Sequence, residues 1–360
     1  MEDNNLEHFG VNLKSSGHEG DLGQKSLNKP TITQVSILYS VVVILFMLLS
    51  NLINKLPVGD FYIKGIAAEM FLVLLPPLIF LFLKRFDRKK ILRLNKVSFF
   101  NIFIIFWIMV FAIPAVGALN LVNILMIKFI FGKTMVSGVP DIINSMDLIK
   151  GIVVIGLSAA VCEEILFRGT IQRGFEKLGA VKSIILTAFL FGLMHHDFQK
   201  LLGTFLLGAI IGFIVYRTDS VFSGMFAHFT NNSLLVLLSF AAAKLGRITG
   251  SSGLSSYDTD KSLSALLNGP RIELAAVFFV WSTIFLVCIT AFIALIYALI
   301  KNTPNISQGA SGGKREYTLK SLVWLVPGVA FIGFLYFAEG LSLKGINIEA
   351  VNTVLRVMGF

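Results

Sequence analysis

The chain has 360 residues, of which 55% are hydrophobic and only 14% are charged, and its formal net charge is +10. Soluble domains carry about 25% charged residues, so this composition excludes a soluble globular protein. Several apolar runs reach the roughly 20 residues that span a bilayer. The sequence therefore predicts an all-α polytopic integral membrane protein with about eight to nine transmembrane helices.

The positive charge indicates membrane topology rather than nucleic-acid binding, and no nucleic-acid partner is expected. Seven basic residues lie between Lys84 and Lys96, and clusters of this kind mark cytoplasmic loops. We therefore expect a multi-pass protein of the cell membrane with its N-terminus in the cytoplasm. Cys162 and Cys288 both lie in apolar runs, so a disulfide framework is not expected.

Nine apolar runs with helical length follow one another along the chain. Their expected limits are 35–53, 64–83, 98–119, 147–178, 181–197, 201–216, 221–243, 272–300 and 322–337. Pro76 and Pro77 should kink the second helix. Asp147 is a plausible N-cap of the fourth, and Gly208 and Gly212 have the spacing of close helix packing.

Four regions follow from this pattern. Residues 1–34 are predicted to be a polar cytoplasmic tail, and residues 35–146 the N-terminal membrane helices, with an outer interfacial segment at 120–146. Residues 147–243 form a core that carries intramembrane charge. Residues 244–360 combine two Gly/Ser loops, near 244–270 and 302–318, with the last membrane helices and an amphipathic end.

The fourth helix contains Glu163, Glu164 and Arg168 within an otherwise apolar stretch. Ionised groups near the bilayer centre cost several kcal/mol, so their presence indicates a function. Glu164 and Arg168 are four residues apart and can form an ion pair on one helix face. Glu163 is rotated by about 100° from Glu164, so it is free to point elsewhere.

Three more polar side chains lie on nearby predicted helices, namely His195, His228 and Asn232. Glu163 and His195 are about equally far from the turn near Gly179, roughly 22 Å at the helical rise per residue. His228 and Asn232 are four residues apart and share a helix face. The levels are compatible, so these side chains are expected to meet in the cytoplasmic half of the bilayer.

A carboxylate, two imidazoles and an amide at one depth predict a hydrolytic site. Glu163 and His195 could activate a water molecule, and His228 and Asn232 could stabilise the oxyanion. The set Glu163, His195 and His228 would also satisfy a catalytic zinc ion. Spacing alone does not decide between the two chemistries.

Glu163-Glu164-x-x-x-Arg168, Phe191-x-x-x-His195 and His228-x-x-x-Asn232 resemble the three motifs of the CPBP family. This family contains the Ras-converting CAAX prenyl proteases and the bacteriocin-processing or Abi intramembrane endopeptidases. The resemblance covers about 147–243 and implies a CPBP-like catalytic core with a proteolytic site. It implies a peptide or membrane-tethered protein as substrate, such as a prenylated CAAX-type, leader, pheromone or bacteriocin-like peptide. We expect metal-free chemistry, with zinc as the alternative.

A non-catalytic membrane immunity or scaffold protein of the same fold is the main alternative, and a proton-coupled transporter is a third hypothesis. Glu164 and Arg168 are expected to support the site, while Cys162 is expected to be inert because a buried apolar thiol is a poor nucleophile. The sequence does not place Glu69. A His-Glu-x-x-His zinc motif is absent.

Overall fold

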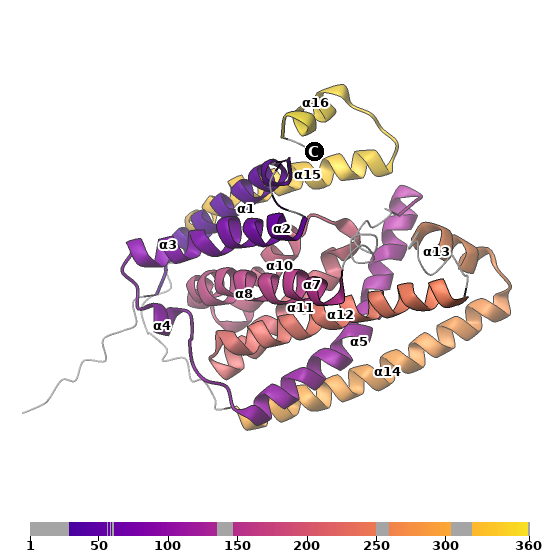
Figure 1. The fold of residues 1–360 in the computed structure, drawn as a ribbon, viewed down its shortest axis with the longest axis horizontal. Helices are drawn as coiled ribbons and strands as arrows, with labels where there is room; N and C mark the ends of the chain where they lie inside the picture. Colours follow the sequence, from indigo (N-terminus) through magenta and orange to yellow (C-terminus); the bar gives the residue numbers. More distant parts are fainter. Residues whose placement is uncertain are drawn as a thin grey trace, which may run out of the picture.

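The computed structural model describes residues 29–55, 57, 59, 61–134, 147–249, 259–303 and 319–358. Within these residues the protein is helical throughout (Figure 1). Seven helices are long and apolar enough to cross a membrane: Ile32–Ser50, Tyr62–Leu83, Phe99–Phe131, Phe198–Thr218, Val221–Leu245, Arg271–Asn302 and Val323–Leu343. The protein is therefore a polytopic membrane protein, as predicted.

The N-terminal part contains three spans. These are α1 (Ile32–Lys55), the continuous run of α2 (Phe61–Ala68), η1 (Glu69–Leu74) and α3 (Leu75–Leu83), and, after the short α4 (Arg88–Ile91), α5 (Phe99–Phe131). The segment η1 is a π-helix directly before Pro76 and Pro77. Because prolines cannot donate to the preceding turn, the helix changes its hydrogen-bond pattern at the predicted kink.

The fourth helix runs from Leu148 to Leu178 without a break, although its geometry alternates. It consists of α7 (Leu148–Gly151), η2 (Ile152–Ser158), α8 (Ala159–Glu164), η3 (Ile165–Ile171), α9 (Gln172–Phe175) and η4 (Glu176–Leu178). The Asp147 side chain accepts a hydrogen bond from the N–H of Ile149, which confirms the predicted N-cap. The segments η2 and η3 are π-helices, and π segments are frequent at functional sites.

The rest of the chain supplies the remaining helices: α10 (Ala180–Met194), α11 (Phe198–Thr218), α12 (Val221–Thr249), α13 (Thr259–Asn268), α14 (Arg271–Asn302), the short η6 (Leu319–Ser321) and η7 (Val323–Leu325), α15 (Val326–Leu343) and α16 (Glu349–Met358). Each of the nine predicted runs has a helical counterpart. The fourth and fifth are not among the seven spans above, because the fourth is divided into short α- and π-helical segments and α10 is short.

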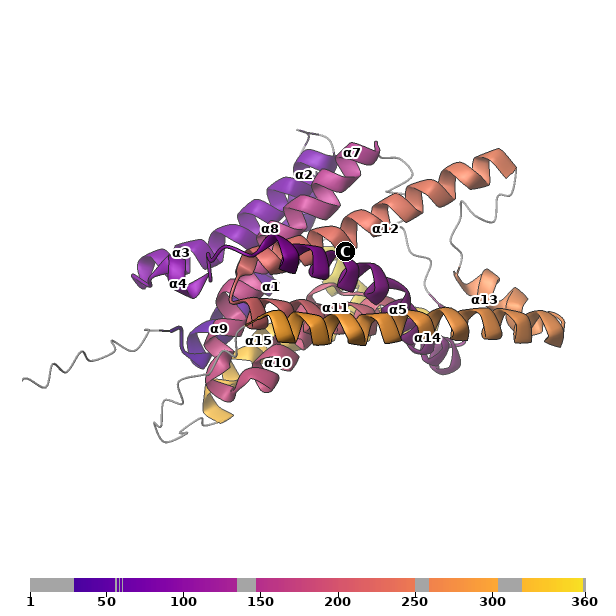
Figure 2. The same cartoon turned by 90° about the horizontal axis from the view of Figure 1, so that it is seen from below.

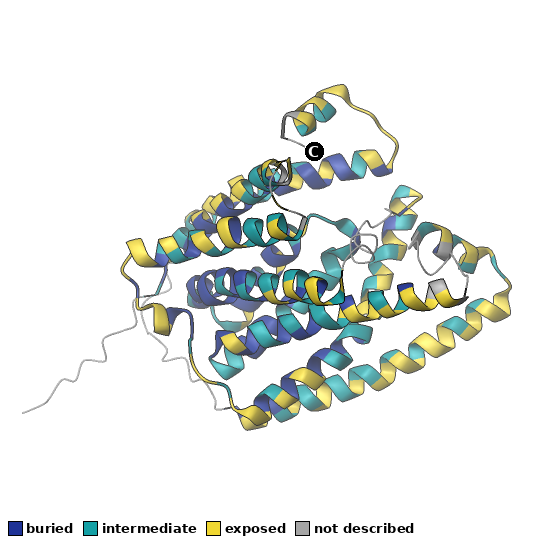
Figure 3. Cartoon of the chain, in the orientation of Figure 1, coloured by how far each residue is buried: buried dark blue, intermediate teal, exposed yellow. Residues whose placement is uncertain are grey.

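The most buried part of the bundle is the fourth helix together with α1, α10 and α15. The largest hydrophobic cluster joins Val42 of α1, Phe167 of η3, Phe191 of α10 and Ile332 of α15. Figure 3 shows many buried residues in the fourth helix, whereas α14 is exposed along most of its length and packs against α5 (Figures 1 and 2). The exposed apolar surface of α14 faces lipid in a membrane.

Two predictions of loop structure were wrong in part. The third helix does not end near Leu119, because α5 continues to Phe131, where Gly132 adopts the left-handed conformation and ends it. The region 244–270 is not one loop, since α12 extends to Thr249 and α13 occupies Thr259–Asn268. The predictions for 1–28, 135–146 and 304–318 lie outside the described residues.

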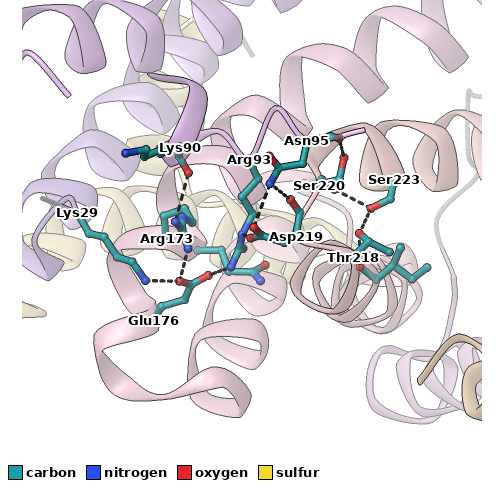
Figure 4. Close-up of polar contacts among 12 residues, drawn as sticks. Lys29, Lys90, Arg93, Asn95, Arg173, Glu176, Thr218, Asp219, Ser220 and Ser223 are labelled. Carbon is teal, nitrogen blue, oxygen red and sulfur yellow. Dashed lines mark hydrogen bonds and ion pairs between the residues drawn. The ribbon is translucent and has the colours of Figure 1, made fainter. Parts of the chain in front are cut away.

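A cluster of charged side chains joins three turns on one side of the membrane (Figure 4). We call this cluster the ionic clasp; it consists of Lys29, Arg93, Arg173, Glu176 and Asp219. Glu176, at the end of the fourth helix, contacts Arg93 at 2.6 Å, Arg173 at 2.7 Å and Lys29 at 3.0 Å. Arg93 also contacts Asp219, between α11 and α12, at 2.6 Å. The clasp therefore ties the loop after α3 to the end of the fourth helix and to the turn between α11 and α12.

Acid should weaken the ionic clasp. Burial raises the pKa of the Glu176 carboxyl, but the charges of Arg93, Arg173 and Lys29 outweigh it and hold the pKa below the ordinary 4.5. A carboxyl with a depressed folded-state pKa stabilises the fold above its unfolded-state pKa, and this stability is lost as the pH falls through the folded-state pKa. We therefore expect thermal stability to decline below about pH 4.5.

The measurement is thermal unfolding in detergent between pH 7 and pH 3.5, with the Glu176→Gln variant beside the wild type. The variant should lose about 3 kcal/mol at pH 7, because it leaves buried cations without their partner. Its unfolding temperature should also depend less on acid than that of the wild type. Parallel pH profiles of the two proteins would contradict the prediction.

Candidate active site

Glu164, Arg168 and His228 form a buried ionic cluster at the centre of the bundle. The Nη1 atom of Arg168 donates to Oε1 of Glu164 at 2.7 Å, and Nδ1 of His228 lies 2.9 Å from the same oxygen. The side chains of Glu164 and Arg168 are fully buried, and that of His228 is nearly so. The predicted pairing of Glu164 with Arg168 is confirmed, and Glu164 additionally orients the imidazole of His228.

Glu163 points away from this pair. Its Oε2 atom lies 3.9 Å from Nε2 of His228, beyond hydrogen-bond distance, and has no hydrogen-bond partner in the described protein. One nitrogen of His228 is thus held by Glu164 while the other faces Glu163. Since the two carboxylates are adjacent in sequence, the rotation of about 100° per residue separates their directions. Oε2 of Glu164 also lacks a hydrogen-bond partner in the described protein, but its Oε1 is held by Arg168 and His228, so Glu163 is the less engaged of the two carboxylates.

His195 is connected to the site by the ring of Phe191, which contacts both His195 and His228. The Phe191 ring makes an edge contact with His195 at 4.7 Å and with His228 at 5.8 Å between ring centroids. The guanidinium of Arg168 lies 4.5 Å from the centroid of the same ring, a distance at which a cation is attracted to the ring face. The Nδ1 atom of His195 bonds to the Phe191 carbonyl at 2.9 Å, which leaves Nε2 as the outward atom.

The structure corrects the position of His195 within its helix. The fifth helix was predicted to continue to residue 197, but α10 ends at Met194 and His195 is its exposed C-cap. The reason is Asp197, whose side chain accepts from the N–H groups of Gln199 and Lys200 and so begins α11. An Asp that caps the next helix stops the preceding one.

Asn232 is close to the fourth helix but is engaged with backbone. Its Nδ2 atom donates to the carbonyl of Ile155 at 2.9 Å, and its Oδ1 accepts from Asn231 at 3.0 Å. Asn232 thereby ties α12 to the π segment η2, one turn beyond His228. The structure brings Glu163, Glu164, Arg168 and His228 together, whereas Asn232 and His195 lie at the edges of this cluster.

Small residues let the site helices approach closely. The carbonyls of Gly208 and Gly212 accept hydrogen bonds at 3.1 Å from Arg168 and from Gln172. A methyl group at Gly224 would lie 2.8 Å from Oε2 of Glu164 and 2.4 Å from a methyl carbon of Val215. The glycines of α11 and α12 therefore leave the room in which Glu164 and Arg168 lie, as the Gly208 and Gly212 spacing predicted.

Glu69 and Cys162 complete the surroundings of Glu163. Glu69, on η1, lies within electrostatic range of Glu163, and its buried Oε2 has no hydrogen-bond partner in the described protein. Cys162 is a free, buried thiol. The sequence identified Glu69 only as an isolated membrane carboxylate, because nothing in its spacing shows that the second helix packs against α8.

The site does not fit a zinc ion as arranged here. Among the residues that the structure describes, no three His, Cys, Asp or Glu side chains are grouped so that they could hold a metal ion. A catalytic zinc needs three protein ligands, and with the Nδ1 atoms of His195 and His228 bonded to Phe191 and Glu164, only Nε2 of each ring remains as a ligand atom. We therefore derive no chemical step through a metal.

The fold and this cluster define a class: a polytopic helical membrane protein whose bundle encloses a carboxylate, a guanidinium and an imidazole. Residues 145–234 match the model of the type II CAAX prenyl endopeptidase Rce1-like family. This match confirms the resemblance read from the three motifs, and it supports a membrane-embedded peptide hydrolase in general. No curated protein and no solved structure matches the chain.

Proposed function

We propose that the protein is an intramembrane endopeptidase that hydrolyses a peptide bond in a membrane-associated peptide or protein. The single observation that carries the proposal is that the two adjacent carboxylates, Glu163 and Glu164, make different contacts. Glu164 is buried in the pair with Arg168 and holds His228, while Glu163 has an oxygen without a partner that faces His228. Glu163 can therefore act as a general base beside the imidazole of His228, whose orientation Glu164 fixes.

In the proposed reaction, Glu163 accepts a proton from a water molecule as the water oxygen attacks the peptide carbonyl carbon, and His195 helps to orient that water. His228 and Asn232 stabilise the resulting oxyanion. Donation from Nε2 of His228 while Nδ1 donates to Glu164 requires a proton on both ring nitrogens. The C–N bond then breaks, and Glu163 returns the proton to the leaving amine.

The family name points to a prenylated CAAX-type protein as one substrate class, and leader, pheromone or bacteriocin-like peptides are the others. We further propose that residues 147–243 are the catalytic core and that the protein lies in the cell membrane with its N-terminus in the cytoplasm. The basic cluster between Lys84 and Lys96 supports this orientation. In that orientation the ionic clasp lies at the cytoplasmic end of the bundle.

The test is cleavage of prenylated and unprenylated candidate peptides by the purified protein in liposomes. Glu163→Ala and His228→Ala should both abolish cleavage while the proteins remain folded. Undiminished turnover in both variants would refute the mechanism. Cleavage should persist in the presence of a chelator, and activity that a chelator removes and zinc restores would overturn the metal-free proposal.

The second candidate is a non-catalytic immunity or scaffold protein of the same fold. The observation that favours it is the engagement of Asn232 with the Ile155 carbonyl, which occupies one of the two N–H donors of its side-chain amide in this arrangement. Under this alternative, Glu163→Ala and His195→Ala would keep full biological activity at normal abundance.

A further inference from the structure

The turn that carries His195 has an unfavourable backbone conformation. His195 ends α10, His196 has a φ of +44°, and Asp197 is extended before α11 begins. A non-glycine residue in the left-handed region is uncommon and persists only where the surrounding contacts hold it. The position of His195 therefore depends on whatever fixes residues 196–198.

Those contacts come from α15, a helix far along the chain. The N–H of Asp197 donates to the hydroxyl of Tyr336 at 3.2 Å, and the N–H of Phe198 donates to Oε1 of Glu339 at 3.4 Å. These two N–H groups stand at the start of α11, where no preceding turn supplies carbonyl partners. Tyr336 and Glu339 thus satisfy donors that the helix itself leaves open.

Aromatic packing reinforces the two hydrogen bonds. The Tyr336 ring lies 5.4 Å from the His196 ring and 4.7 Å from the Phe198 ring between centroids, so it is inserted between the two sides of the turn. Tyr336 is 6% exposed and Glu339 is 9% exposed, so both act from the interior of the bundle. The turn cannot shift without displacing side chains that are themselves packed.

We propose that Tyr336 and Glu339 are positioning residues that fix the turn after α10 and thereby place the imidazole of His195. The role of His195 in peptide hydrolysis rests on the proposed function. Both residues lie on α15, outside the matched core of residues 145–234. The C-terminal helices consequently contribute to the site, although no catalytic side chain comes from them.

The experiment compares Tyr336→Phe, which removes only the hydroxyl, with Glu339→Leu, which removes the acceptor, and Glu339→Gln, which retains it. The matched control is Tyr39→Phe, because the Tyr39 hydroxyl donates to the Leu190 carbonyl on the same helix α10, at 3.0 Å and away from the turn. Two quantities are measured in liposomes: the rate of His195 modification by diethyl pyrocarbonate, mapped by fragmentation mass spectrometry, and kcat and KM for peptide cleavage.

Tyr336→Phe and Glu339→Leu should change the rate of His195 modification severalfold, since a loosened turn alters both the exposure of its Nε2 and the bond of its Nδ1 to the Phe191 carbonyl. They should lower kcat about tenfold, the effect of one lost hydrogen bond on a barrier, with KM nearly unchanged. Glu339→Gln should restore wild-type behaviour, and Tyr39→Phe should change neither quantity.

Unaltered His195 modification in Tyr336→Phe and Glu339→Leu would overturn the inference, as would equal changes in Tyr39→Phe. The modification rate does not require the protein to be a protease. If the wild type cleaves no peptide while His195 responds to the variants as expected, the proposed function fails and the positioning of His195 by α15 stands.

Discussion

Replacing Glu163 by Gln is expected to lower kcat for peptide cleavage by about 10²–10⁴-fold, the usual contribution of a general base. Glutamine has nearly the same shape but cannot accept the proton of the attacking water. The Oε2 atom of Glu163 has no hydrogen-bond partner in the described protein, so the change breaks no hydrogen bond of this atom and removes only its 3.9 Å contact with Nε2 of His228. KM and the unfolding temperature should therefore remain close to those of the wild type.

The matched control is Glu273→Gln, which makes the same chemical change at an exposed position on α14. It should leave kcat unchanged. Initial rates with a single purified peptide, measured over a range of substrate concentrations, separate kcat from KM. A Glu163→Gln variant with more than a tenth of the wild-type kcat would assign the base to another residue.

Replacing Arg168 by Met should have the largest effect on stability. Arg168 and Glu164 are both fully buried at 2.7 Å, and removing one partner of a buried ion pair costs about 3–5 kcal/mol, because the other charge is left uncompensated. The variant also loses the hydrogen bond from Arg168 to the Gly208 carbonyl. We expect low abundance and a strongly lowered unfolding temperature in detergent.

The double variant Glu164→Gln with Arg168→Met removes both charges and should recover much of the lost stability. It should still have a strongly lowered kcat, since a neutral amide is a weaker hydrogen-bond partner for the Nδ1 atom of His228 than the Glu164 carboxylate. Lys90→Met is the control for an exposed pair, because Lys90 and Asp87 lie 3.6 Å apart in solvent and such pairs contribute about 0–1 kcal/mol. Equal unfolding temperatures of Arg168→Met and Lys90→Met would contradict the prediction.

The site was predictable where its contacts are local. Glu164 and Arg168 are one helical turn apart, so their pairing follows from helix geometry, and the same geometry separates the direction of Glu163. The packing role of Gly208 and Gly212 was also predictable, because small residues four apart give a flat helix face. In each case a single helix, recognised from its apolar run, was sufficient.

The prediction was least accurate at the ends of helices. The length of α10 was overestimated because the apolar pattern continues through Leu193 and Met194 toward His195, while the capping preference of Asp197 was overlooked. The predicted end of α5 came too early, because polar residues such as Asn120 and Asn123 interrupt the apolar pattern and suggested a break in the helix. In the structure both side chains donate to backbone carbonyls at the start of α11.

By itself, the sequence determined the membrane class, the order of the helices and the three motifs, because composition and helical spacing are properties of neighbouring residues. Only the tertiary structure decided that Glu164 holds His228, across 64 residues, and that Glu339 holds the turn after His195, across 141 residues. Such contacts depend on how whole helices pack and on where each one ends. That packing engages Oε1 of Glu164 with Arg168 and His228, whereas Oε2 of Glu163 makes no hydrogen bond within the described residues.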